Sequence, residues 1–183
     1  MQQTIFNNNF YWRFQVANRE QLDARINSIK PGRSGKFKWG ENCESDKTLL
    51  NPSEWVDVLA PTMKKFSDII EKGFEWQIEE SWLNFYKKGY FQEVHCHFDC
   101  DLVAVYFPQT PKEGYSKFFF YDRTDYNLST PLIKLLNTVN NWYPAFEGGD
   151  ILIFPAHMLH GVTPHKHGDI RTSLSVNIRI RPL

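Results

Sequence analysis

The spacing of hydrophobic residues along the chain changes near residue 74. Before that point, hydrophobic residues recur at intervals of three and four, which is typical of helices with one buried face. After it, hydrophobic and polar residues alternate over short segments, as they do in strands with one buried face. Helices in front and strands behind predict an α+β fold that is mainly β.

The first predicted helix follows Asn18, whose side chain is suited to an N-cap. Leu22, Ile26 and Ile29 then fall on one helical face. The Pro-Gly pair at residues 31–32 is expected to end this helix.

A second helix is predicted to begin near Ser53 and to end at Gly73. Pro61 lies inside it and is expected to kink or split it, because proline has no N–H to donate. Residues 4–16 are rich in aromatic residues and predict one or two strands, whereas the polar, glycine-rich residues 32–50 predict a loop.

The remaining strands are expected to form a sandwich or barrel. Turn residues separate them, among them Gly89 and the pair at residues 148–149. The predicted strand regions are residues 74–86, 92–107 with an interruption near 98–101, 116–123, 149–162 and 171–182.

Composition adds a size limit and excludes some partners. A length of 183 residues fits one domain with one core, so residues 1–183 are expected to form a single domain. Lys and Arg together number 21, as do Asp and Glu, so no overall charge attracts the chain to nucleic acid or to an anionic membrane.

The cysteines and the first residues indicate a compartment. Cys43, Cys96 and Cys100 are too few, and odd in number, for a disulfide framework, which favours a reducing environment. The N-terminal residues lack the pattern of a signal peptide, and no apolar run is long enough to span a bilayer. We therefore expect a soluble cytoplasmic protein, in the host cytoplasm if the source is viral.

A cluster of possible metal ligands lies in the second half of the chain. His95, His97 and Asp99 occur at alternate positions, so on a regular strand they share one face. His160 follows a very apolar strand, where a polar ring needs a partner. Two imidazoles and a carboxylate suit non-haem iron(II), so these four residues are the candidate ligands.

Arg171 is the second chemical signal. It follows His160 by eleven residues, which is enough for a strand, a turn and a return strand that brings it inside the barrel. A buried guanidinium requires an anionic partner, and its planar fork suits a carboxylate. That partner is either an acidic residue of the chain or a bound carboxylate.

Short motifs in this order resemble a known superfamily. They are Trp82 to Asn84 (WLN), His95 to His97 (HCH), Val103 to Tyr106 (VAVY), Gly149 to Pro155 (GDILIFP), His160 to Pro164 (HGVTP) and Arg171 to Asn177 (RTSLSVN). The sequence is similar to the iron(II)/2-oxoglutarate dioxygenases, and within them to 2OG-Fe(II) oxygenases of marine bacteria and phages. The resemblance implies a double-stranded β-helix (jelly roll) over residues 80–183, on which the strand and helices of residues 1–79 would pack.

The resemblance also implies roles for individual residues. His95 and His160 would be iron ligands, and Arg171, with Ser173 beside it, would bind the far carboxylate of 2-oxoglutarate. Tyr106 would add a hydrogen bond to that carboxylate, and Asn84 would line the same pocket. No catalytic residue beyond the metal ligands is implied.

The remaining ligand is open at this point. The superfamily usually supplies His-x-Asp or His-x-Glu, and His97-Phe98-Asp99 has that form. The closer branch aligns HCH, which would make His97 the ligand in a triad of three histidines. Both choices are compatible with a strand on which these residues share a face.

The implied cofactors are Fe(II), 2-oxoglutarate as cosubstrate, and O₂. The implied reaction is hydroxylation of a C–H bond with release of succinate and CO₂. The substrate would be a residue of a peptide or protein, such as proline, or a small molecule. The alternatives are a cupin-like three-histidine enzyme that does not use 2-oxoglutarate, and a non-catalytic metal-binding jelly roll. Arg171 discriminates between them, because neither alternative needs it.

Overall fold

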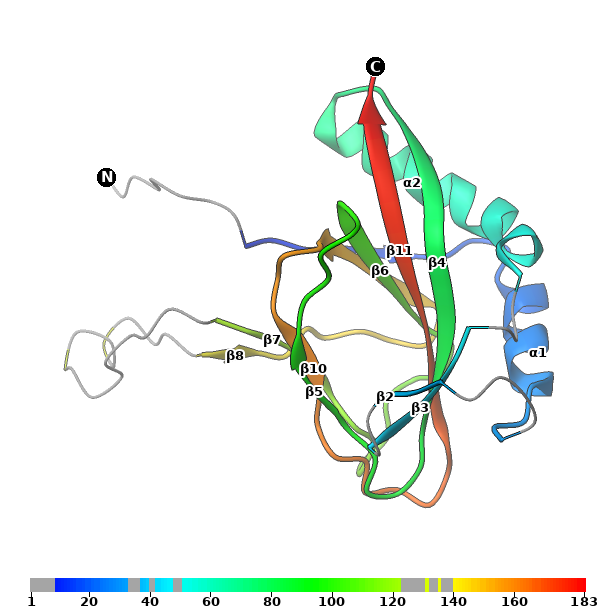
Figure 1. Cartoon of the computed structure of the whole chain (residues 1–183), viewed down its shortest axis with the longest axis vertical. Helices are drawn as coiled ribbons and strands as arrows, with labels where there is room; N and C mark the ends of the chain where they lie inside the picture. The colour runs from blue at the N-terminus through cyan, green and yellow to red at the C-terminus, as the bar shows by residue number, and fades with distance from the viewer. Residues whose placement is uncertain are drawn as a thin grey trace.

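Two antiparallel β-sheets face each other in the computed structural model, which describes residues 9–32, 37–39, 42–47, 51–122, 131, 135 and 140–183 (Figure 1). Within these residues the larger sheet has the strand order β1-β9-β6-β11-β4-β3-β2, and the smaller has the order β5-β10-β7-β8. The strands are β1 (Trp12–Gln15), β2 (Phe37–Trp39), β3 (Cys43–Asp46), β4 (Phe74–Tyr86), β5 (Gln92–His95), β6 (Leu102–Phe107), β7 (Phe118–Tyr121), β8 (Asn141–Trp142), β9 (Asp150–Pro155), β10 (His160–Val162) and β11 (Arg171–Pro182).

The centre of the larger sheet is the pairing of β4 with β11. The two strands are antiparallel from the pair Tyr86–Arg171 to the pair Phe74–Pro182, with one irregularity after Asn177. Strand β6 pairs with the other edge of β11. The bounds of β4 and β11 agree with the alternating segments expected at residues 74–86 and 171–182.

Side-chain alternation divides the core into two layers. On β11, Leu174 and Val176 point to an apolar layer on the outer face of the larger sheet. Arg171, Ser173 and Ser175 point the other way, into the space between the sheets. The polar residues of this strand therefore line the interior of the sandwich rather than its surface.

Two helices, α1 (Glu20–Ser28) and α2 (Val56–Ile70), cover the outer face of the larger sheet (Figure 1). Ile26 of α1 and Met63 of α2 are almost fully buried in the outer apolar layer. The expected N-cap was wrong: Arg19 holds the cap position, and Asn18 has a left-handed backbone, with φ of 54°.

The expected split at Pro61 was also wrong, because α2 runs without interruption from Val56 to Ile70. Buried Leu59 and Met63, on either side of the proline, tie both halves of the helix to the same apolar layer. A short 3-10 turn, η1 (Pro52–Glu54), precedes it.

Residues 32–50, expected to be a loop, contain β2 and β3. Strand β3 pairs with β4 through Ser45 and Asn84, while β1 pairs with β9 at the opposite side of the sheet. The segment before residue 80 thus supplies strands as well as helices, and position 80 itself falls within β4. The division of one domain into a supporting segment and a core at residue 80 stays a prediction.

Among the helices that the structure describes, none has the length and apolar character required to cross a membrane.

Truncation of Leu174 tests the outer apolar layer. This side chain is 1% exposed, so Leu174→Ala should lower the free energy of unfolding by about 2–5 kcal/mol through lost burial and a residual cavity. The same change at Leu183, which is 85% exposed, should alter it by less than about 0.5 kcal/mol. Urea denaturation measures both, and equal effects would contradict the assignment of this layer.

Candidate active site

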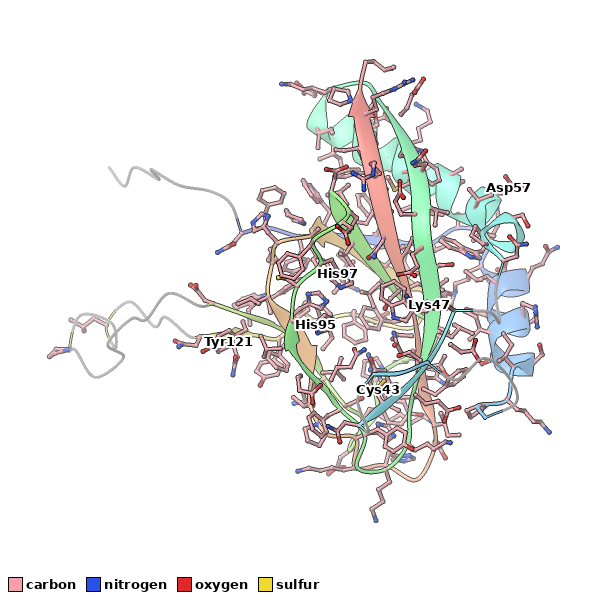
Figure 2. All side chains as sticks on the ribbon, viewed as in Figure 1. Cys43, Lys47, Asp57, His95, His97 and Tyr121 are labelled. Atoms are coloured by element: carbon pink, nitrogen blue, oxygen red, sulfur yellow. The ribbon has the colours of Figure 1, made fainter. Side chains whose placement is uncertain are left out.

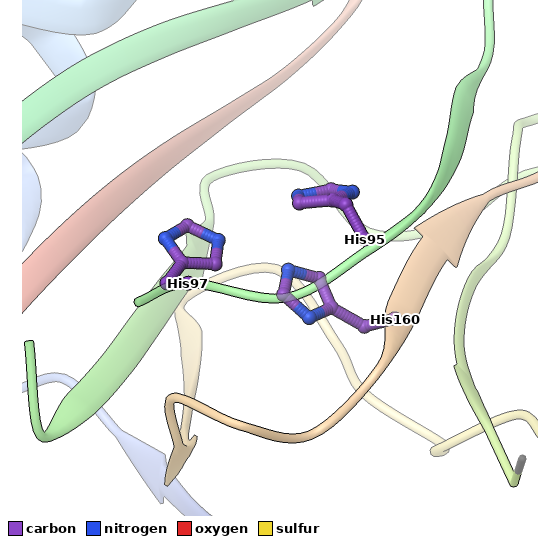
Figure 3. Close-up of side chains that lie close together, drawn as sticks. All are labelled: His95, His97 and His160. Atoms are coloured by element: carbon purple, nitrogen blue, oxygen red, sulfur yellow. The ribbon is translucent and has the colours of Figure 1, made fainter. Parts of the chain in front are cut away.

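Three histidines meet between the two sheets (Figure 3). His95 ends β5 and lies directly opposite His160 at the start of β10, while His97 follows β5 by two residues. One ring nitrogen from each lies within 4.8 Å of the others, and the His95 and His160 ring centroids are 4.3 Å apart. Three imidazoles at this separation can share one metal ion.

Each of the three rings has its Nδ1 atom next to an oxygen atom. The Nδ1 of His95 is 2.8 Å from the carbonyl oxygen of Glu93, and that of His160 is 2.9 Å from the carbonyl oxygen of Met158. The Nδ1 of His97 is 2.7 Å from Oδ1 of Asn177. Because these oxygens only accept, each Nδ1 carries the proton, and each Nε2 keeps a lone pair for a metal.

Burial keeps the rings neutral, which is the form that binds metal. Desolvation, followed by the nearby His95, lowers the pKa of His97 to about 4. Desolvation also lowers the pKa of His95, and it lowers that of the 4% exposed His160 well below its usual value. Because the three rings are neutral, they do not repel a cation that binds between them.

Asp99 does not join this group. Strand β5 ends at His95, and the chain bends at Phe98 and Asp99, so the alternation of faces expected across residues 95–99 is lost. Asp99 is exposed, and its backbone oxygen accepts a hydrogen bond from Arg179. The backbone N–H of His97 instead donates to Ala156, which holds His97 against the strand that precedes His160.

Arg171 is buried, with 3% of its surface exposed, at the start of β11. Its Nη1 donates to Oγ of Ser116 at 3.2 Å, but its Nη2 is buried without a hydrogen-bond partner. The guanidinium lies over the rings of Tyr86, 4.9 Å from the centroid, and Phe107. Among the described residues no carboxylate forms an ion pair with it, and desolvation lowers its pKa.

A buried cation with an unused donor is costly unless an anion completes it. Arg171, Ser173 and the three histidines line the same narrow cavity between the sheets. A divalent metal at the histidines and a dicarboxylate that joins it to Arg171 would supply both missing partners. The residues present therefore fit 2-oxoglutarate and a divalent metal.

Tyr106, expected in this cavity, lies on the other face of the sheet. Its hydroxyl donates to Asp23 of α1, and its ring belongs to the outer apolar layer. The reason is strand parity: Val105 and Phe107 of β6 face the cavity, so Tyr106 between them faces the helices.

Tyr86, rather than Tyr106, is the tyrosine that lines the cavity beside Arg171. It is the cross-strand neighbour of Arg171, and its buried hydroxyl donates to Oε1 of Gln92 at 2.7 Å. Desolvation raises its pKa, so the hydroxyl stays protonated and can donate. Sequence reasoning missed it, although it lies two residues after Asn84 on the same strand and therefore shares its face.

Asn84 and Ser173 are also cross-strand neighbours, but only Ser173 is among the residues that line the cavity, where both were expected. Asn84 donates from Nδ2 to Ser173 at 3.4 Å and to Ser175 at 2.9 Å, and its Oδ1 accepts from Ser45 at 2.6 Å. Asn84 is therefore largely occupied with joining β3, β4 and β11. Ser45 was not anticipated, because its segment was expected to be a loop.

The comparisons with known proteins agree with this geometry. The family described as "Putative 2OG-Fe(II) oxygenase" matches residues 80–177, which is more than half of the 183-residue chain. The chain belongs to this family of oxygenases, which depend on Fe(II), 2-oxoglutarate and O₂. A search of curated proteins finds no match.

Solved structures share the fold at low sequence identity. HygX from Streptomyces hygroscopicus, with nickel, 2-oxoglutarate and hygromycin B bound, matches with a TM-score of 0.64 and 11% identity over 96% of this chain and 84% of its own. The 2-oxoglutarate complex of a viral collagen prolyl hydroxylase from Paramecium Bursaria Chlorella virus-1 has a TM-score of 0.59 and 15% identity, covering 92% and 94%.

A 2OG-Fe(II) oxygenase family oxidoreductase from Burkholderia pseudomallei matches with a TM-score of 0.60 and 16% identity, covering 86% of this chain and 77% of its own. These likenesses confirm the double-stranded β-helix (jelly roll) fold.

Alanine substitutions at His97 and Asp99 test which of the two is a metal ligand. His97→Ala should weaken Ni(II) binding by more than about 100-fold, because a ligand costs more to lose than an outer contact. Asp99→Ala should leave the affinity unchanged, because its carboxylate lies outside the triad. Isothermal titration calorimetry measures both, and the reverse ranking would assign the ligand to Asp99.

Asn177 tests the contact that orients His97. Asn177→Ala removes the acceptor for Nδ1, and metal affinity should fall by about 10–100-fold. Asn141 is an exposed asparagine on β8, and Asn141→Ala, the matched control, should leave the metal affinity unchanged. Equal affinity for both variants would show that His97 does not need this hydrogen bond.

Proposed function

We propose that the protein hydroxylates a C–H bond of its substrate, with His95, His97 and His160 holding iron(II). Arg171, with Ser173 and Tyr86 beside it, would bind the far carboxylate of 2-oxoglutarate. The observation that carries this proposal is the buried, unpartnered Nη2 of Arg171 in the cavity that the three histidines also line. Iron held there would supply the redox chemistry by which O₂, 2-oxoglutarate and the substrate C–H together give the alcohol, succinate and CO₂.

The chain's own residues would orient the cosubstrate and exclude water. Arg171 is held by Ser116 and by the rings of Tyr86 and Phe107, so its free donor keeps a fixed direction. The rest of the wall includes apolar side chains from both sheets. These would keep water away from the reacting centre and strengthen the ion pair. They are Val103, Val105, Phe107, Phe118 and Val162.

The substrate is either a residue of a peptide, such as proline, or a small molecule. One structural neighbour is a collagen prolyl hydroxylase, and another holds hygromycin B, so the shared fold accommodates both classes. We further propose a cytoplasmic location, supported by three free cysteines. Arg171 favours this function over a cupin-like three-histidine enzyme or a metal-binding module, because neither explains a buried, incomplete arginine site.

Substitution of Arg171 tests the cosubstrate site. Arg171→Ala should raise the KM for 2-oxoglutarate by about 100-fold, since hydrogen bonds to a charged group contribute about 1.5–3 kcal/mol each. Arg171→Lys should give a KM between those of the wild type and Arg171→Ala, because lysine retains the charge without the planar fork. Arg181→Ala, on the exposed end of β11, is the matched control.

The measurement is succinate release by the iron-loaded protein over a range of 2-oxoglutarate concentrations, without added substrate. Ni(II) titration of each variant shows whether the metal site is intact. An Arg171→Ala protein that binds metal and keeps the wild-type KM would exclude this arginine from the cosubstrate site.

A further inference from the structure

A second hollow lies on the outer side of His97 and Trp82, next to the metal site. It has a volume of about 170 Å³, and it shares His97 and Trp82 with the inner cavity. The two rings are stacked, 5.8 Å apart and 17° from parallel, so they form the wall between the two spaces. The rest of this outer cleft comes mainly from Lys47, Glu80, Phe98, Asp99 and Asn177. Lys47 and His97, two residues that line this cleft, are labelled in Figure 2.

The outer cleft offers apolar surface at its mouth. Phe98 is 88% exposed, which is unusual for so large an apolar side chain. Trp82 on the opposite element lies under the ammonium of Lys47, with 5.8 Å between Nζ and the ring centroid. The indole therefore already has a cation over it, and the aliphatic part of a ligand is what it can still contact.

The charges of the outer cleft are unbalanced. Lys47 pairs with Glu80, and Arg179, which donates to the backbone oxygen of Asp99, pairs with Glu79. The carboxylate of Asp99 forms no ion pair within the part of the chain that the structure describes, and it is exposed. The cleft therefore presents one uncompensated negative charge beside two aromatic surfaces and a metal-binding histidine.

We propose that the outer cleft binds the primary substrate and that this substrate carries a protonated amine. The ammonium would pair with Asp99, and the adjoining carbons would pack on Phe98 and Trp82, with a C–H directed past His97 to the metal. This inference rests on the proposed function. An acidic substrate would meet the repulsion of Asp99 at the same rim.

The test uses three compounds with a free amine: 1,5-diaminopentane, L-lysine acetylated on its side chain, and a blocked Gly-Lys-Gly peptide. Each is compared with its counterpart in which the free amines are acetylated. The first two represent small molecules, and the third represents a protein residue. Binding is measured by calorimetry on protein loaded with Ni(II) and 2-oxoglutarate, which does not turn over. Succinate release by the iron-loaded protein is measured in parallel.

At least one amine should bind more tightly than its acetylated counterpart and should raise succinate release. Asp99→Asn should weaken that binding by about two- to fivefold, the size expected for an ion pair at an exposed rim. Asp57→Asn on α2, labelled far from the site in Figure 2, makes the same chemical change and should have no effect.

The proposal fails if no amine binds, if the acetylated compounds bind equally well, or if Asp99→Asn binds amines as the wild type does. Basal succinate release separates this failure from that of the proposed function. If the wild type releases succinate without an amine preference, only the substrate class is wrong. If it releases none with iron and 2-oxoglutarate, the proposed function is wrong and the inference falls with it.

Discussion

The antiparallel pairing of β4 with β11 is the constraint on which the rest of the site depends. It places Tyr86 opposite Arg171 and Asn84 opposite Ser173, so one register positions three polar residues that line the cavity and the asparagine that supports them. Because side chains alternate along a strand, a shift by one residue would turn the arginine toward the helices and bring Leu174 inward. The apolar layer beneath α1 and α2 prevents such a shift, since it would have to bury charge.

Burial gives the two ends of the cavity opposite electrostatic characters. At one end, three imidazoles are neutral because burial lowers their pKa, so they can bind a cation. At the other end Arg171 keeps its charge, because a guanidinium is hard to deprotonate, and it lacks an anion. A metal ion and a carboxylate satisfy both ends, and a single small dicarboxylate joins them.

The strands of the second half and the cluster of histidines could be predicted from the sequence, because alternation and ligand spacing are local patterns. The separation of Asp99 from the three histidines could not, since it depends on β5 ending at His95. Tyr106 was expected in the cavity because motif position does not reveal parity, which the pairing of β6 with its neighbours determines. Strands β2 and β3 are short strands at one side of the larger sheet, where β3 pairs with β4 and β2 pairs with β3, and segments this short leave little periodicity in the sequence.

The three hydrogen bonds that orient the histidines differ in where they originate. Glu93 and Met158 provide theirs through backbone carbonyls, whereas Asn177 provides its through a side chain. Every amino acid has a backbone carbonyl, so substitutions at positions 93 and 158 leave two of the three hydrogen-bond acceptors in place. The third can be altered by one mutation. Among these three acceptors, the side chain of Asn177 is therefore the one that a single substitution can remove while the backbone and the three histidines stay unchanged.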